Sequence, residues 1–441
     1  MKKTLSLILC ALMLVGMLAA CGNGGATTEA QSPAESSAAP QASSTGEKTE
    51  VVFWHSMSGA FGEAIDKIVA DYNASQDEVH VTAEYQGNYY DMAAKLQTAV
   101  TSGDSPNLAQ LEMVRVKMFS DYGILADITD AAAEAGLDTT QFFDGLMASC
   151  DWGAGLYGLP FNRSTPMFYY NKDMFAEVGL DPESPPTNWE ELREYANKLS
   201  IADERWGFEV PIDAWFYEAF IMQSDCQLLN EDETDIAFNN DAGTAPLYLL
   251  REMIDEGSMK APPGQEYNSY EAARSDFAAG ITGMIITSSG DLGTLNTACD
   301  FEVGTAFLPG NTRYGVPTGG ANVVALTGHD AEMAATMDFV KYLTSADVAG
   351  YWSSVTGYVP ISQAAADSDV YQTFLNENEN GKTAMAQMAY TDIPRPVNSN
   401  WSQIHTEIMM TEMQRCIEDR SYTPEEAVAA ISEQAKALLA G

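Results

Sequence analysis

The stretch Leu159–Phe175, with the sequence LPFNRSTPMFYYNKDMF, limits the folds open to this chain more than any other segment. Pro160 and Pro166 each push the preceding residue toward an extended backbone, and hydrogen-bonding residues lie between them. The apolar run Met167–Tyr170 is typical of a buried strand, and Asn171 is suited to cap a helix that follows. Such a segment fits a chain that crosses between two lobes along a cleft wall. An ordinary corner between a loop, a strand and a helix would explain the same residues.

The N-terminal 49 residues are predicted to be a leader and a tether. Lys2 and Lys3 precede an apolar run, so residues 1–20 are expected to be a secretion signal. Small residues before Cys21, with Gly22 after it, resemble the lipobox of bacterial lipoproteins, which predicts cleavage there and lipidation of Cys21. A plain signal peptide or an uncleaved anchor is the alternative. The rest of residues 21–49 has no aromatic or large aliphatic side chain, so we expect a disordered tether.

About 390 residues remain, which is more than one hydrophobic core usually supports, so two domains are expected. No later stretch reaches the length of a membrane span. The formal net charge of −41 argues against nucleic acid or anionic lipid as a partner surface, although a small anionic ligand is still allowed. No metal site or cofactor is expected, because the cysteines form no C-x-x-C pair and the acidic run at 231–235 lacks the spacing of a calcium loop. The pairing of Cys150, Cys226, Cys299 and Cys416 stays open.

Strand-like and helix-like segments alternate along the chain, which favours an α/β fold with mostly parallel strands. The first expected strands are Val51–Trp54, Val79–Ala83 and Leu108–Leu111. Ligands bind beyond the carboxyl ends of such strands. Residues 54–58, 85–90 and 110–113 should therefore lie at one rim of the sheet.

Two polar turns in the second half are further candidates for ligand contacts. Thr287-Ser288-Ser289-Gly290 follows an expected strand and opens a helix, so its hydroxyls and free N–H groups could hold a ligand oxygen or simply cap the helix. Thr318-Gly319-Gly320 allows the backbone to approach a ligand closely.

The motifs FWHSMSG, YQGNYYDM, LPFNRSTPMFYYNKDMF, VGLDPESPPTNWEEL, ITSSGDLG, PTGGAN and TGYVPIS, in this order, are similar to those of the extracellular solute-binding proteins of bacterial ABC importers. The resemblance covers residues 50–440 and is closest to the glycerol-3-phosphate-binding branch of the maltose-binding-like group. It implies an α/β fold of two lobes with a ligand cleft between them. Three hinge crossings are implied near residues 161–167, 308–318 and 355–361. Lobe 1 would comprise residues 50–163 and 312–356, and lobe 2 would comprise residues 164–311 and 357–441.

The resemblance also implies which residues contact the ligand. It places Tyr89, Ser164, Ser288, Gly320 and Tyr358 on the ligand, with Trp215 as a stacking ring. Hydroxyl and backbone N–H groups suit ligand oxygens, and rings cover apolar faces. Core packing is the alternative for the aromatic residues.

Two positions depart from the branch. The branch has a glutamate after the glutamine of the third strand, whereas this chain has Met113 there and Glu112 one residue before it. The branch has a phosphate-binding arginine after Gln-Ile, and His405 stands in that place. Arginine offers a permanent charge and a bidentate fork, which histidine does not. Arg163 or Arg395 could replace it, although a surface or hinge role would suit each of them as well.

The resemblance implies a monomeric lipoprotein, anchored to the outer face of the cell membrane, that passes a small solute to an ABC permease. The ligand would be glycerol-3-phosphate or a glycerophosphodiester, with a neutral sugar or oligosaccharide as the alternative. A carbohydrate-active enzyme or an adhesin is less favoured. The chain has no G-x-S-x-G, S-x-x-K or H-E-x-x-H motif, but its 63 acidic residues still allow a glycosidase carboxylate pair.

Overall fold

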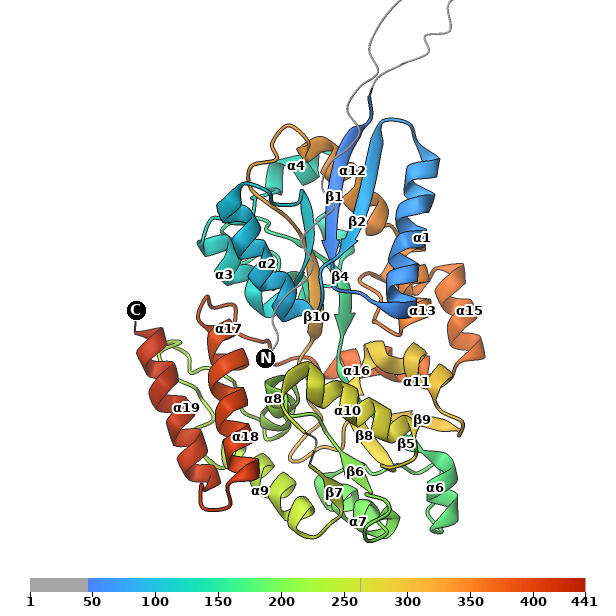
Figure 1. The fold of residues 1–441 in the computed structure, drawn as a ribbon, viewed down its shortest axis with the longest axis vertical. Coiled ribbons are helices and arrows are strands. Elements are labelled where there is room, and N and C mark those ends of the chain that lie inside the picture. Colours follow the sequence, from blue (N-terminus) through green and yellow to red (C-terminus); the bar gives the residue numbers. More distant parts are fainter. Residues whose placement is uncertain (1–46, 262, 441) are drawn as a thin grey trace, which may run out of the picture. The chain divides into compact units, whose positions relative to one another are not determined.

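The computed structural model describes residues 47–261 and 263–440 (Figure 1). The predicted signal peptide, the predicted lipidation site Cys21 and nearly all of the predicted tether lie outside these residues. The described chain contains two sheets of five strands each, built from different parts of the sequence.

The first sheet has the strand order β2-β1-β3-β10-β4. Its strands are β1 (Thr49–His55), β2 (Val79–Tyr85), β3 (Leu108–Glu112), β4 (Leu159–Ser164) and β10 (Gly319–Ala325). Strand β1 is parallel to β2 and β3, whereas β10 is antiparallel to β3 and β4. Val51, Phe53 and His55 are buried on alternate positions of β1, which is the pattern that predicted a strand there.

The second sheet has the order β7-β6-β8-β5-β9. Its strands are β5 (Pro166–Asn171), β6 (Phe208–Glu209), β7 (Met259–Lys260), β8 (Met284–Ser288) and β9 (Val303–Ala306). Strand β5 is buried along its whole length and is antiparallel to both β8 and β9. The predicted cap is present, because the Asn171 side chain accepts a hydrogen bond from the Met174 N–H at 2.9 Å.

Helices cover both sheets. Up to residue 200 they are α1 (Gly59–Ser75), α2 (Tyr89–Ser102), α3 (Val116–Asp121), α4 (Thr129–Glu134), α5 (Asp144–Met147), α6 (Lys172–Glu177) and α7 (Trp189–Leu199). The central helices are α8 (Ala214–Gln223), α9 (Asp241–Asp255), α10 (Glu266–Ala278) and α11 (Leu292–Ala298). The last third has α12 (Met333–Leu343), α13 (Ala346–Thr356), α14 (Gln363–Ala366), α15 (Asp369–Glu377), α16 (Gly381–Gln387), α17 (Trp401–Gln403), α18 (Met410–Glu418) and α19 (Pro424–Leu439).

Shorter helical turns complete the set. They are the 3₁₀ turns Met113–Arg115, Thr139–Gln141, Ser289–Asp291 and Met388–Tyr390, and the π-helical turn Ile404–Met409, which joins α17 to α18. None of the helices among the described residues is both long and apolar enough to cross a membrane. Cys150, Cys226, Cys299 and Cys416 are all free thiols.

The chain passes between the sheets at places that match the expected crossings. Thr165 alone separates β4 in the first sheet from β5 in the second, and residues 307–318 lead from β9 back to β10. After α13, Gly357 adopts a φ of 90°, which favours glycine. The Val359 N–H then bonds the Arg163 carbonyl at 2.8 Å. The third segment therefore lies directly beside the first.

Candidate functional site

A cluster of hydroxyl and amide groups forms at the end of the first sheet. Tyr89 is the first residue of α2, and its hydroxyl accepts a hydrogen bond from Asn162 Nδ2 at 2.6 Å. Burial raises the pKa of Tyr358, while hydrogen bonds to Asn162 and Tyr89 oppose that shift. Two tyrosines predicted to touch the ligand are thus joined by one asparagine, which the sequence analysis did not single out.

The asparagine is held in place by residues from neighbouring strands. Gln110 Nε2 donates to Asn162 Oδ1 at 2.6 Å, and the Ser56 N–H donates to Gln110 Oε1 at 2.7 Å. Both amide side chains are fully buried. This chain of bonds links the ends of β1, β3 and β4 to α2, at the rim where the α/β pattern predicted a site.

The serines and glycines predicted at the site lie around Thr165. Ser164 pairs with Gly319 in the first sheet, and Ser288 pairs with Pro166 in the second. The Ser288 hydroxyl accepts a hydrogen bond from the Gly290 N–H at 3.1 Å. Ser288 therefore caps the helical turn, which was the alternative to a ligand contact. Gly320 has a φ of 87°, and a Cβ built there would lie 1.9 Å from the Asn162 carbonyl oxygen. Only glycine fits at that position.

Two rings make close contacts across the boundary between the sheets. A Cβ built on Gly290, beyond β8, would lie 2.8 Å from Cζ of Tyr358, so the tyrosine ring packs directly on this backbone. A Cβ built on Gly319 would lie 2.3 Å from Cζ2 of Trp215, which belongs to α8. The Trp215 indole N–H is buried and has no hydrogen-bond partner among the described residues. A ligand oxygen at this contact would satisfy that donor.

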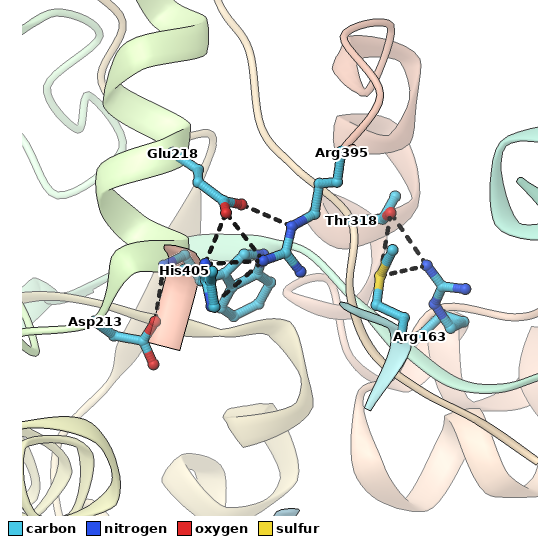
Figure 2. Close-up of polar contacts among 8 residues, drawn as sticks. Arg163, Asp213, Glu218, Thr318, Arg395 and His405 are labelled. Carbon is cyan, nitrogen blue, oxygen red and sulfur yellow. Dashed lines mark hydrogen bonds and ion pairs between the residues drawn. The ribbon is translucent and has the colours of Figure 1, made fainter. Parts of the chain in front are cut away.

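His405 lies in a buried charged network rather than at an open surface. Its Nδ1 is 2.7 Å from Glu218 Oε1, and Arg395 Nε is 2.7 Å from Glu218 Oε2 (Figure 2). Burial pushes the pKa of Glu218 upward, but Arg395 and His405 outweigh it and hold that pKa below its usual value. Burial raises the pKa of Asp213, which caps α8 through the Trp215 N–H at 2.7 Å. The network therefore supports the start of the helix that presents Trp215.

The two remaining candidates have partners of their own. Glu112 accepts a hydrogen bond from Arg115 Nε at 2.9 Å. Met113 stands where the resembled branch has glutamate, and its sulfur atom contacts Arg163. The Arg163 side chain is fully buried, so the expected surface role for this residue is wrong. A small cavity of about 70 Å³ lies between these groups, bounded by Met113, Ser149, Thr318 and Arg395.

Comparison with known proteins agrees with this architecture. A family model described as bacterial extracellular solute-binding protein matches residues 67–379. The chain belongs to this family. The sn-glycerol-3-phosphate-binding periplasmic protein UgpB of Escherichia coli (strain K12) is 30% identical to this solute-binding protein over 358 residues, which cover 77% of this chain and 80% of the relative.

Two solved structures share the fold. The cyclic alpha-maltosyl-1,6-maltose binding protein from Arthrobacter globiformis aligns with a TM-score of 0.74 and 25% identity over 89% of this chain and 99% of its own. UgpB from Mycobacterium tuberculosis, solved in complex with glycerophosphocholine, aligns with a TM-score of 0.79 and 22% identity over 90% of this chain and 99% of its own. The predicted two-lobe α/β fold is confirmed. The residue ranges given for the two lobes stay a prediction.

The family defines the general role. Its members are non-enzymatic proteins that bind small solutes outside the cytoplasm and deliver them to the permease of an ABC importer. This chain is therefore a solute-binding protein and no enzyme, as the sequence predicted.

Proposed function

We propose that this solute-binding protein captures glycerol-3-phosphate or a glycerophosphodiester and delivers it to an ABC permease. The proposed contacts are Tyr89, Glu112, Ser164, Trp215, Ser288, Gly320, Tyr358 and His405. The observation that carries the proposal is the convergence of hydroxyl and amide groups around Thr165, where Asn162 joins Tyr89 to Tyr358. A phosphate group offers several acceptor oxygens, and such a set of uncharged donors suits it. The relative at 30% identity is itself named for binding sn-glycerol-3-phosphate.

A neutral sugar is the second candidate. It is favoured by Trp215, whose ring lies over the backbone of Gly319 and suits the apolar face of a sugar. It is also favoured by His405 and Arg395, which already share the Glu218 carboxylate. The structural relative from Arthrobacter globiformis is named for a cyclic maltose derivative.

A thermal-shift screen separates the two candidates. A ligand present at 100 times its dissociation constant adds about 2.7 kcal/mol to the stability of the folded state. We expect glycerol-3-phosphate and glycerophosphodiesters to raise the melting temperature, and maltose and monosaccharides to leave it unchanged. A shift with sugars alone would favour the second candidate and leave the transport role intact.

We also propose that the protein is monomeric and is held to the outer face of the membrane through lipid on Cys21. The lipid anchor rests on the residues around Cys21 and on the composition of the segment that follows, and the monomeric state rests on the resemblance to other solute-binding proteins. Several acyl chains on one cysteine would give stable attachment, because each buried CH₂ contributes about 0.8 kcal/mol.

A further inference from the structure

Arg163 is a buried cation whose hydrogen-bond partners are all uncharged. Its side chain is fully buried in the crossing between β4 and β5. Nε donates to the Gly319 carbonyl at 3.0 Å. Nη2 contacts Met113 Sδ at 2.9 Å and Thr318 Oγ1 at 3.1 Å (Figure 2). Nη1 lies 3.0–3.2 Å from three further oxygens, those of the Leu146 carbonyl, Ser149 Oγ and Asn322 Oδ1.

Other arginines of the chain have acidic partners. The buried Arg395 pairs with Glu218, and the partly exposed Arg274 pairs with Asp291. Within the described part of the chain, no carboxylate forms an ion pair with Arg163. Burial lowers the pKa of Arg163 to about 10, with a further contribution from the positive charge of Arg395. An isolated buried charge is costly, so an unpaired guanidinium kept in the fold calls for a function.

The position of Arg163 connects this charge to the proposed ligand contacts. Arg163 pairs with Gly320 across the sheet, and Ser164 is the next residue of its strand. Side chains alternate between the two faces of a strand. Asn162 and Ser164 therefore share the face of the hydroxyl cluster, and the guanidinium lies directly behind it.

We propose that Arg163 makes the cleft selective for anionic solutes, because the ligand's phosphate supplies the counter-charge that the protein omits. This inference rests on the ligand site given under the proposed function. It adds that Arg163 is the residue that makes this site prefer a negatively charged ligand. The uncharged donors around Thr165 place the phosphate oxygens, and Arg163 favours a negative charge among them without touching the ligand. For charge separations of roughly 8–12 Å and an effective dielectric constant near 20, one unit of ligand charge would change the affinity roughly 10- to 30-fold.

Two variants of Arg163 test the proposal. Arg163→Lys keeps a positive charge at this position, whereas Arg163→Gln keeps hydrogen-bonding groups but removes the charge. Calorimetry with sn-glycerol-3-phosphate should show affinity at least about tenfold weaker for the Gln variant than for the Lys variant. Affinity for inorganic phosphate should fall in the same way.

Equal affinities in the two Arg163 variants would overturn the role of Arg163. If Arg163→Gln does not fold, Arg163→Lys and Arg163→Met repeat the comparison, because methionine is close to lysine in length and carries no charge. Failure of the proposed function looks different, since the wild type itself would then give no heat with sn-glycerol-3-phosphate. In that case inorganic phosphate is the probe, and its failure to bind the wild type would overturn the anion selectivity as well.

Discussion

Replacing Glu218 with glutamine should destabilise the protein by about 3–5 kcal/mol, the range for breaking a buried ion pair. The side chain is fully buried, and its two oxygens lie 2.7 Å from Arg395 Nε and 2.7 Å from His405 Nδ1. Glutamine has the same length, so the substitution leaves no cavity and removes only the charge. Arg395 would then be a second buried cation without a counter-charge, in addition to Arg163.

Urea denaturation followed by circular dichroism measures this loss as a lower midpoint with an unchanged slope. The effect also depends on pH. Because the pKa of Glu218 is below its usual value in the folded state, its stabilising contribution is present above the pKa of the unfolded chain. This stabilisation is lost as the pH falls through the pKa that Glu218 has in the folded state. The difference between wild type and variant should therefore narrow in acid.

The matched control is Glu194→Gln, because Glu194 forms an exposed pair with Lys198. This surface substitution should change the unfolding free energy by no more than about 0.5 kcal/mol. A loss of less than about 1 kcal/mol in Glu218→Gln at neutral pH would refute the view that this carboxylate holds the network together.

Three further predictions address other parts of the molecule. Burial and the charge of Asp276 raise the pKa of Glu209 to about 8, although the charge of Lys260 opposes this shift. The protonated Glu209 therefore stabilises the folded state in acid, and this stabilisation is lost as pH rises. Wild-type stability should therefore fall by up to about 3 kcal/mol between pH 5 and 8, and Glu209→Gln should flatten that melting profile. Trp215→Ala should weaken ligand binding by about 1–3 kcal/mol in calorimetry, whereas unfolding in circular dichroism would identify a core residue instead. Cys21→Ala should release the protein from the membrane fraction with unchanged ligand affinity, and retention after signal processing would contradict lipidation.

Local features of the fold could be predicted from the sequence because they depend on neighbouring residues. In Leu159–Phe175 the prolines favour an extended backbone, and the apolar run between Pro166 and Asn171 favours burial. Both strands and the Asn171 cap are present in the structure. The same residues could not show that Thr165 alone would separate β4 in the first sheet from β5 in the second.

The partners of the site residues depend on packing between distant segments, which no local pattern encodes. His405 and Glu218 are 187 positions apart in sequence and share a hydrogen bond. Arg163 was expected to serve as a surface, hinge or ligand residue because charged side chains are seldom buried without an ion pair. It is buried because its donors find oxygen and sulfur acceptors from three other segments of the chain. Asn162 was missed for a related reason, since only the fold brings Gln110 and Tyr89 to it.

The central claim is that the cleft of this solute-binding protein takes a phosphorylated glycerol. Isothermal titration calorimetry of the wild type with sn-glycerol-3-phosphate, glycerophosphocholine and maltose tests it most directly. We predict saturable binding of at least one of the two phosphate compounds at one site per chain, and no heat with maltose. Saturable binding of maltose, with no heat from either phosphate compound, would contradict the claim.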